Sequence, residues 1–311
     1  ILSLFSNICL WLTNIALIIN PFQALNSACR AMDMLKTHTD EYKRWADQKL
    51  LNFTSNLNDL SVEIRNPFKI AKSEKDAIRH KLTTHNIVFF SIPEDDNDKV
   101  AIKSFASQIG LGRYEYDSNS DADGLTEIKV SETCHNKVDY IPYTNKTLKW
   151  HTDGYYNDAK NSIESWMLYC NSPGAQGGTN KYFDHEIAYI LFNQKFNNIG
   201  DLMLDNTYTI PKNQLTGRKQ ICNPVFRYEN SYLYMKFTMR EKNILWNEKS
   251  LSASKNLKDI IEKTEKYHVC NKFTERQGVI TNNVIHMRTS FTNSENNTRL
   301  LYRLRSKNRV I

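Results

Sequence analysis

Two histidines and one aspartate are the strongest candidates for chemistry in this chain. One residue separates His151 from Asp153, and His286 follows far along the sequence. In an extended segment the side chains of residues i and i+2 lie on the same face, so His151 and Asp153 can bind one ion together. Two imidazoles and one carboxylate form the ligand set of a non-haem Fe(II) centre that leaves three metal positions open. The spacing therefore predicts a metal site built from these three residues.

A predicted strand near the C-terminus carries three arginines on one face. Strand alternation places Arg299, Arg303 and Arg305 on one side, together with Leu301, whereas the other side is wholly apolar or aromatic. One interpretation is a half-exposed edge strand whose arginines meet water. The other is that at least one guanidinium points into a barrel, where its planar fork would suit a carboxylate. Arg299 follows His286 by thirteen positions, so one loop could connect a metal site to a carboxylate site.

The elements that would position these residues are short strands with helical insertions. The apolar patterns and turn residues predict an α+β chain, mainly β, with N-terminal helices flanking a double-stranded β-helix (jelly roll). Helices are expected at 39–51, 73–84 with Ser73 as N-cap, 99–109, 186–192 with Asp184 as N-cap, and 257–267. Strands are expected at 87–90, 166–170, 279–280, 284–286 and 299–305, with a hairpin at 225–237.

Composition excludes several classes of protein. Hydrophobic residues make up 40% and charged residues 24% of the 311 positions, as in ordinary globular proteins. The net charge of +7 is not concentrated in any run, which argues against nucleic-acid binding. The six cysteines show no C-x-x-C spacing, so they are interpreted as reduced thiols of a cytoplasmic protein.

The N-terminal segment differs from the rest. No charged side chain occurs before Arg30, and residues 1–19 are mostly apolar. We expect 1–31 to be an apolar extension and 35–311 to form a single catalytic domain. A membrane anchor at 1–19 and a packed helix remain alternatives, although polar residues interrupt the apolar run and no basic segment precedes it.

Four segments occur in an order that points to a known family. They are LKWHTDG (148–154), GGTNKYFD (177–184), NVIHMRTSF (283–291) and RLLYR (299–303). Together they resemble the taurine dioxygenase (TauD/TfdA-like) family of Fe(II)/2-oxoglutarate oxygenases, over most of residues 42–305. The resemblance implies Fe(II), 2-oxoglutarate and O2 as cofactor and cosubstrates, with His151, Asp153 and His286 as iron ligands. It also implies that Arg299 binds the distal carboxylate of 2-oxoglutarate, with Thr179 and Asn180 beside it. Asn180 stands where the family often has a threonine.

The same resemblance implies hydroxylation of an unactivated C–H bond of a small molecule, with release of succinate and CO2. Arg303, four residues after Arg299, matches an arginine that contacts the substrate sulfonate in taurine dioxygenase. Carnitine-pathway hydroxylases share the character of 177–184 and bind a trimethylammonium group, for which Tyr143, Tyr155 and Tyr156 could supply an aromatic surface. Asn145 is a further substrate candidate. Substrate charge therefore stays open, as do a non-catalytic binding protein on the same fold and a homo-oligomer.

The evidence for other candidate functional residues is weaker. His185-Glu186 begins like a zinc-protease motif, but Tyr189 occupies the position of its second histidine. Trp150 is interpreted as barrel packing. Arg288 could equally face the site or form a structural ion pair, and Arg240 and Arg227 are weaker candidates for substrate contact.

Overall fold

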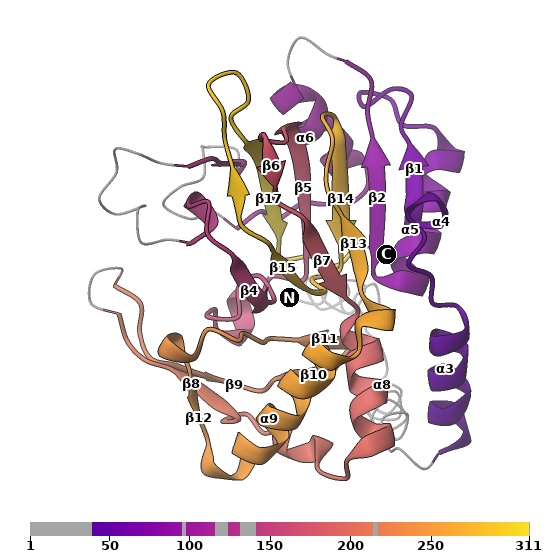
Figure 1. Cartoon of the computed structure of the whole chain (residues 1–311). Helices are drawn as coiled ribbons and strands as arrows, with labels where there is room; N and C mark the ends of the chain where they lie inside the picture. Colours follow the sequence, from indigo (N-terminus) through magenta and orange to yellow (C-terminus); the bar gives the residue numbers. More distant parts are fainter. Residues whose placement is uncertain (1–38, 95–97, 116–123, 131–140, 214–216, 311) are drawn as a thin grey trace, which may run out of the picture. The chain divides into compact units, whose positions relative to one another are not determined.

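The computed structural model describes residues 39–94, 98–115, 124–130, 141–213 and 217–310 (Figure 1). The chain divides into two compact units, one comprising Ile1–Trp45 and Tyr228–Tyr232 and the other Ala46–Arg227 and Leu233–Ile311. In the smaller unit, the rings of Tyr42 and Trp45 lie 5.8 Å apart. The expected extension 1–31 and its candidate anchor lie outside the described residues. Within the described ranges, no helix is long and apolar enough to cross a membrane.

The larger unit is built on a six-stranded sheet with the order β1-β2-β14-β5-β17-β3. All neighbours are antiparallel except β1 and β2. Strands distant in sequence lie side by side, as Figure 1 shows for β5 and β17. The strands are β1 (Ser61–Glu63), β2 (Ile87–Ser91), β3 (Thr126–Ile128), β5 (Ser165–Ser172), β14 (Gln277–Thr281) and β17 (Leu300–Ser306).

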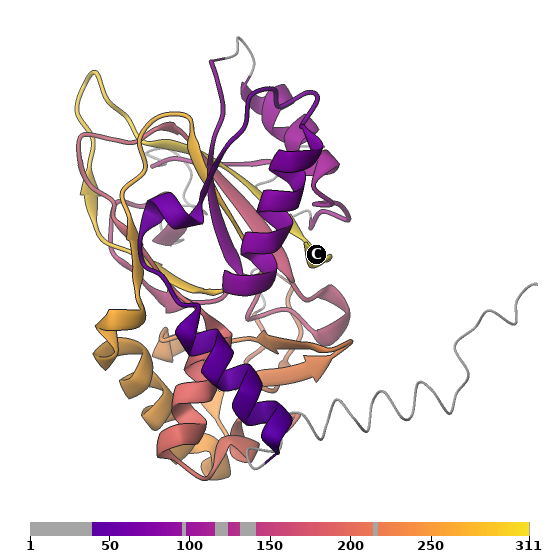
Figure 2. The same ribbon diagram turned by 90° about the vertical axis from the view of Figure 1, so that its right-hand side faces the viewer.

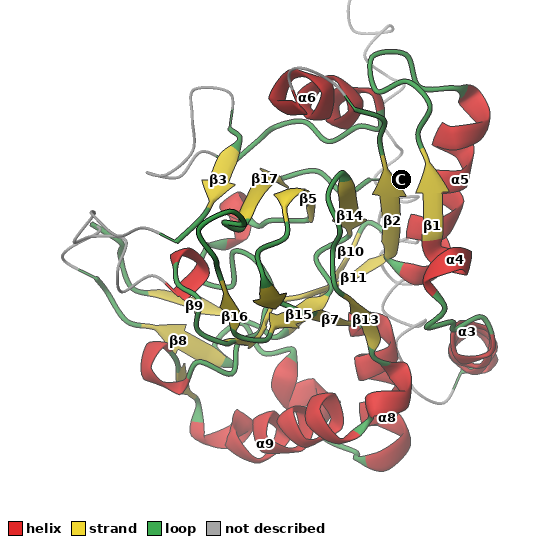
Figure 3. Ribbon diagram, turned by 45° about the horizontal axis from the view of Figure 1, so that its top comes forward, coloured by secondary structure: helices red, strands yellow, loops and turns green. Residues whose placement is uncertain are grey.

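A four-stranded sheet with the order β13-β7-β15-β4 carries the candidate metal ligands. Its strands are β4 (Leu148–His151), β7 (Asn180–Phe183), β13 (Val269–Asn271) and β15 (Ile285–Arg288), and the short pair β6 (Gln176–Gly177) and β16 (Phe291–Thr292) lies beyond them. Residues of both large sheets line one cavity, so the two sheets face each other (Figure 3). The expected α+β fold with a double-stranded β-helix is confirmed.

Strand alternation divides the buried side chains of the six-stranded sheet into two groups. Val88 and Phe90 of β2 and Tyr169 of β5 pack in one cluster with residues of helices α5 (Lys72–His85) and α6 (Asp98–Gln108). Ile87 and Phe89 point the other way and pack with residues of the four-stranded sheet. Figure 2 shows α5 lying across the outer face. The sheet is thus buried on both sides, which explains why β2 is apolar throughout.

Two further helices belong to the larger unit. Helices α8 (His185–Lys195) and α9 (Glu248–Lys263) pack against each other, as Figure 3 shows below the four-stranded sheet. The remaining elements are α3 (Asp40–Leu51), α4 (Leu57–Leu60), β8 (Tyr208–Ile210), β9 (Ile221–Asn223), β10 (Phe226–Glu229), β11 (Tyr232–Met235), β12 (Leu245–Trp246), and the 3-10 helices η1 (Ile141–Tyr143), η2 (Ala159–Asn161), η3 (Ile199–Leu202), η4 (Glu241–Asn243) and η5 (Glu265–Tyr267).

The expected starts of α3, α5, α6 and α8 are each one residue from those observed, whereas the start of α9 was placed much too late. Helix α5 begins at Lys72, before Ser73, and its first turn is held by Glu74, whose carboxylate accepts a hydrogen bond from the Ala71 amide at 2.8 Å. Helix α9 begins nine residues earlier than predicted, where Asn247 accepts a hydrogen bond from the Lys249 amide at 3.0 Å. The first half of α9 is rich in Ser and Lys, so its apolar period was too weak to mark the start. Asp184, by contrast, caps α8 as expected.

Candidate metal centre

Two neighbouring strands of the four-stranded sheet place the two candidate histidine ligands side by side. In the β4–β15 pairing His151 lies opposite His286, and in the β15–β7 pairing His286 lies opposite Tyr182. Directly opposed residues project from the same face of a sheet, so the two imidazoles meet. Their ring centroids are 4.3 Å apart. The sheet register, not local sequence, thus brings together histidines 135 positions apart.

Asp153 lies in the turn that follows β4, where the backbone is fixed on both sides. The Asp153 amide donates to Asn283 Oδ1 at 2.9 Å, and Asn283 Nδ2 donates to the Asp153 carbonyl at 3.0 Å and the Ile163 carbonyl at 2.7 Å. Gly154 follows with φ of 66°, and a Cβ there would lie 2.6 Å from Ile163 Cγ1. Only glycine therefore suits this turn. Asn283 and Gly154 hold the carboxylate beside the histidines.

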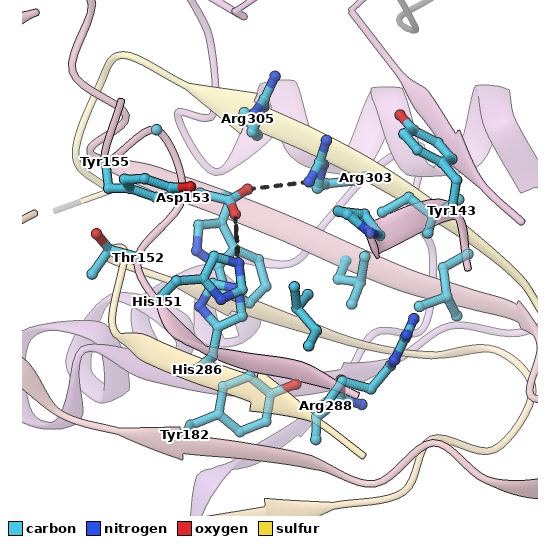
Figure 4. A pocket seen from close by; sticks show the side chains of 18 of the residues that line it. Tyr143, His151, Thr152, Asp153, Tyr155, Tyr182, His286, Arg288, Arg303 and Arg305 are labelled. Atoms are coloured by element: carbon cyan, nitrogen blue, oxygen red, sulfur yellow. Dashed lines mark hydrogen bonds and ion pairs between the residues drawn. The ribbon is translucent and has the colours of Figure 1, made fainter. Parts of the chain in front are cut away.

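The three side chains have the geometry of a metal-binding group. Oδ1 of Asp153 lies 3.7 Å from Nε2 of His151 and 3.7 Å from Nε2 of His286. One ligand atom from each residue lies within 4.8 Å of the others, and among the described residues this is the one His/Cys/Asp/Glu group that meets this test. Figure 4 shows the two rings and the carboxylate converging on one side of the cavity.

The protonation states suit a divalent cation. Nδ1 of His151 lies 2.8 Å from the Lys149 carbonyl, and Nδ1 of His286 lies 3.0 Å from the Val284 carbonyl. Each Nδ1–H donates to its carbonyl, which leaves the Nε2 lone pair for a metal. Burial, reinforced by the neighbouring His286, lowers the pKa of His151 to about 3, and burial also lowers the pKa of His286.

Asp153 is held in its charged form. Burial by itself would raise the pKa of Asp153, but the positive charge of Arg303 is the main opposing effect, and the pKa falls to about 2. Nη1 of Arg303 lies 3.5 Å from Oδ2 of Asp153 (Figure 4). Two neutral imidazoles and one carboxylate therefore converge at neutral pH, and this donor set fits Fe(II).

Arg303 and Arg305 of β17, and Arg299 directly before that strand, face this centre from the opposite sheet. Arg299, Leu301, Arg303 and Arg305 all line the cavity, and Arg299 and Arg305 are each only 4% exposed, so the half-exposed edge strand is excluded. β17 is also an interior strand, between β5 and β3. Arg305 is paired, with Nη2 2.8 Å from Glu115 Oε2 and Nη1 donating to the Tyr156 hydroxyl at 2.9 Å.

Arg299 differs from the two arginines of β17. Its guanidinium lies 4.9 Å from the centroid of the Phe291 ring, and no described carboxylate pairs with it. Burial lowers the pKa of Arg299 to about 10, so the side chain is still charged at neutral pH. A buried cation without an anion is unfavourable unless a ligand supplies one. Arg299 is therefore suited to an anionic ligand group.

Two more arginines line the cavity without a carboxylate partner among the described residues. Arg288 donates to the carbonyls of Thr144, at 2.9 Å, and Lys146. It therefore faces the cavity and is anchored by backbone, not by an ion pair. Arg240 follows the Phe237–Met239 segment, which extends the sheet at β4, and Thr238 bridges to His151. Arg240 lines the same cavity as His151.

The cavity has a volume of about 100 Å³ and is partly open to solvent. Of the residues proposed from sequence, His151, Asp153, His286, Asn180, Arg299, Arg303 and Tyr155 line it, as do Tyr143 and Tyr156. Thr179 and Asn145 do not. The Thr179 amide donates to Thr289 Oγ1 at 3.0 Å, and the Asn145 carbonyl accepts from the Phe291 amide at 3.1 Å. Arg227 lies elsewhere, 3.5 Å from Glu164.

Sequence reasoning missed Asn283 and Tyr182. Asn283 adopts φ of 54°, a left-handed conformation in which Asn is enriched, but its clasp on Asp153 depends on tertiary contacts. Tyr182 carried one usable signal. It lies two positions after Asn180, a residue already proposed from sequence, so the two share a face where the segment is extended, as it is in β7.

Comparisons with known proteins agree with this geometry. The model of the family described as "Taurine catabolism dioxygenase TauD, TfdA family" matches residues 48–305. No curated protein matches the chain in sequence.

Several solved structures share the fold at low identity. A taurine dioxygenase from Burkholderia xenovorans is 16% identical over 79% of this chain and 88% of its own, with a TM-score of 0.54. An asparagine oxygenase in complex with Fe(II), 2S,3S-3-hydroxyasparagine and succinate is 14% identical over 76% and 82%, with a TM-score of 0.54. AAD-2 in complex with Mn(II) and N-oxalylglycine is 11% identical over 83% and 99%, with a TM-score of 0.59. Because the family model covers most of the chain and the ligand group is present, this chain belongs to the TauD/TfdA family of Fe(II)/2-oxoglutarate-dependent dioxygenases.

Proposed function

We propose that this enzyme hydroxylates an unactivated C–H bond of a small molecule that carries an acidic group. Bound Fe(II), with 2-oxoglutarate and O2, supplies the oxidising power for such a step, and the cosubstrate leaves as succinate and CO2. His151, Asp153 and His286 would hold the metal, and the other residues of the cavity would bind and orient the two organic molecules. The observation that carries the proposal is one cavity lined by both the His-Asp-His group and Arg299, a buried cation with no carboxylate partner among the described residues.

Arg299 and Asn180 would bind the distal carboxylate of 2-oxoglutarate. Both are buried cavity residues, at 4% and 6% exposure. A guanidinium can donate two parallel hydrogen bonds to a carboxylate, and the Asn180 amide can add a third. Thr179 would position Asn180 without contacting the cosubstrate. Its amide donates to Thr289 and thereby holds the start of β7 against the segment after β15.

The charge of the cavity supports an acidic substrate. Its lining includes Arg240, Arg288, Arg299, Arg303 and Arg305 but a single described carboxylate, Asp153. One Fe(II) and one 2-oxoglutarate dianion cancel each other, so the excess of positive charge persists when both are bound. A substrate carboxylate or sulfonate would offset it, with Arg240 and Arg303 as its candidate contacts.

The betaine alternative has weaker support. A trimethylammonium group would need the faces of Tyr143, Tyr155 or Tyr156, but Tyr156 already has the Arg218 guanidinium 5.8 Å from its ring centroid. Its hydroxyl also accepts from Arg305. A second cation would meet repulsion from the arginines on the opposite wall.

Two experiments test the proposal. The first measures succinate release from 2-oxoglutarate with Fe(II) and ascorbate, alongside anaerobic binding of 2-oxoglutarate to the Fe(II)-loaded protein. We expect both signals. If folded protein gives neither, the oxygenase proposal fails, whereas binding without turnover on any substrate would favour a non-catalytic binding protein.

The second experiment screens sulfonates, amino acids, dicarboxylates and betaines for stimulated succinate release. We expect acidic compounds to stimulate turnover and betaines to have no effect. Stimulation by betaines alone would overturn the proposed substrate charge while leaving the oxygenase assignment intact.

A further inference from the structure

The hydroxyl of Tyr182 stands out among the polar atoms beside the metal centre. Tyr182 is 2% exposed and lines the cavity, and its hydroxyl has no hydrogen-bond partner among the described residues. Its ring neighbours are aromatic: Phe89 at 5.7 Å and Trp166 at 6.4 Å between centroids. Burying an unpaired hydroxyl costs free energy, so a ligand that accepts its hydrogen bond would recover that cost.

Sheet register places Tyr182 along the expected path of the cosubstrate. Tyr182 lies opposite the metal ligand His286, and Asn180, two residues earlier on the same face, lies opposite Arg288. A Cβ added to Gly178, two residues before Asn180, would lie 3.6 Å from Nε of Arg299. The segment from Gly178 through β7 therefore extends from the Arg299 side chain to the metal ligand, which are the two groups that 2-oxoglutarate must reach.

The hydroxyl points toward the arginine end of this path. Figure 4 shows the Tyr182 oxygen directed away from Asp153 and toward the side of the cavity where Arg288 lies. Electrostatics agree: burial raises the pKa of Tyr182, and the opposing influence is the charge of Arg299. The hydroxyl is thus a protonated donor at neutral pH, within the field of the guanidinium assigned to the distal carboxylate.

We propose that Tyr182 binds the distal carboxylate of 2-oxoglutarate, as a neutral donor that acts together with Arg299. The inference rests on the proposed function, because it requires that 2-oxoglutarate occupies this cavity. The aromatic neighbours leave the hydroxyl no protein partner in the described structure, so it stays available for the ligand. Tyr182 is consequently a cosubstrate-binding residue and not only part of the core.

Tyr182→Phe tests this with a minimal change. Anaerobic titration of the Fe(II)-loaded protein with 2-oxoglutarate, followed by its charge-transfer absorbance, gives the dissociation constant without turnover. A hydrogen bond to a carboxylate corresponds to about a 10- to 100-fold change in affinity. We expect a loss in that range for Tyr182→Phe, and an unchanged dissociation constant would overturn the proposal.

The Tm of the protein without cosubstrate distinguishes a ligand-binding hydroxyl from a structural one. Removing an unsatisfied buried hydroxyl should leave Tm unchanged or raise it, whereas removing a structural hydrogen bond would lower it. A clear fall in Tm would therefore contradict the proposal. Tyr169→Phe is the matched control: Tyr169 is also fully buried, but it packs on the helix-covered face of the sheet, so 2-oxoglutarate affinity should not change.

A truncated cosubstrate identifies the carboxylate. 2-Oxobutanoate keeps the keto-acid end but lacks the distal carboxylate, so wild type and Tyr182→Phe should bind it equally. An equal loss for both ligands would place the hydroxyl at the metal end and overturn the assignment. Failure of the proposed function is a separate result, since the wild-type protein would then bind no 2-oxoglutarate at all.

Discussion

Two clusters of buried charge in the larger unit differ in whether their charges are paired. Beside α8, Lys49 Nζ lies 2.7 Å from Asp184 Oδ2 and 2.5 Å from Glu186 Oε2, and it donates to the Thr84 carbonyl at 2.8 Å. Asn86 donates to Asp184 at 3.1 Å. In the cavity, by contrast, Arg299 has no carboxylate partner among the described residues, and Arg288 pairs only with backbone carbonyls.

The difference separates a structural network from a ligand site. Lys49 and its partners satisfy one another, so the network ties α3 to α8 without any ligand. The cavity keeps an excess of positive charge, and its His-Asp-His group has the geometry to bind a metal ion. Interrupting the first cluster should reduce stability, and interrupting the second should reduce binding.

Loss of the metal carboxylate should have the largest effect. In Asp153→Ala the site keeps two neutral imidazoles but loses its only anion, so affinity for Fe(II) should fall beyond the roughly 100-fold that removal of an outer hydrogen-bond partner costs. Succinate release should be undetectable while the circular dichroism spectrum stays native. Retained turnover in this variant, or in His151→Ala, would exclude the assigned ligand set.

Lys49→Met should have the next largest effect, on stability alone. Removing one partner of a buried ion pair leaves Asp184 and Glu186 without their cation, which destabilises by about 3–5 kcal/mol. Chemical denaturation measures this loss. The affinity of the folded variant for 2-oxoglutarate should match wild type, and a large change there would mean that the two clusters are coupled.

The same variant makes a prediction about pH. Burial by itself would raise the pKa of Asp184, but the charge of Lys49 outweighs it and the pKa is lowered. Burial opposes the raised pKa of Lys49, which the charges of Asp184 and Glu186 bring about. The stabilisation should therefore be complete at neutral pH, be lost as acid protonates Asp184 below its usual range, and be lost again above the usual pKa of lysine. The wild-type advantage over Lys49→Met should shrink at both extremes.

Arg299→Met should have the opposite consequences to Lys49→Met: a loss of 2-oxoglutarate affinity without a loss of stability. Because Arg299 is a buried cation without an anion, its removal should leave the unfolding free energy of the cosubstrate-free protein unchanged or raise it. Anaerobic titration should show about a 100-fold weaker affinity for 2-oxoglutarate, as expected for loss of a bidentate charged contact. A destabilised variant with normal affinity would assign Arg299 to structure instead.

Local spacing was sufficient to predict part of this arrangement. The alternation of residues 299–305 placed three arginines and Leu301 on one face, and the structure places that face in the cavity. The His-x-Asp spacing likewise identified two residues of the metal-binding group. These patterns can be recognised in the sequence because side chains alternate between the two faces of a strand with a period of two residues.

Contacts that depend on register or on distant loops were not predictable. The hydrogen bonds between Asn283 and Asp153 join residues 130 positions apart, and the ion pair of Lys49 with Asp184 joins residues 135 positions apart. In the sequence, Tyr182 is only one more aromatic residue of the segment 177–184. Its hydroxyl becomes notable only when its neighbours prove to be Phe89, Trp166 and His286.

Arg240→Gln should have the smallest effect, and it separates substrate binding from cosubstrate binding within the cavity. Arg240 lines the same cavity as His151 and is not assigned to the cosubstrate, so its loss should raise KM for an acidic substrate about tenfold with little change in kcat, the signature of binding shared by ground and transition states. Anaerobic affinity for 2-oxoglutarate should be unchanged. Arg227→Gln is the matched control, because Arg227 pairs with Glu164 away from this cavity. If Arg240→Gln instead weakened 2-oxoglutarate binding as strongly as Arg299→Met, the positive wall would serve the cosubstrate alone, and the argument for an acidic substrate would lose its basis.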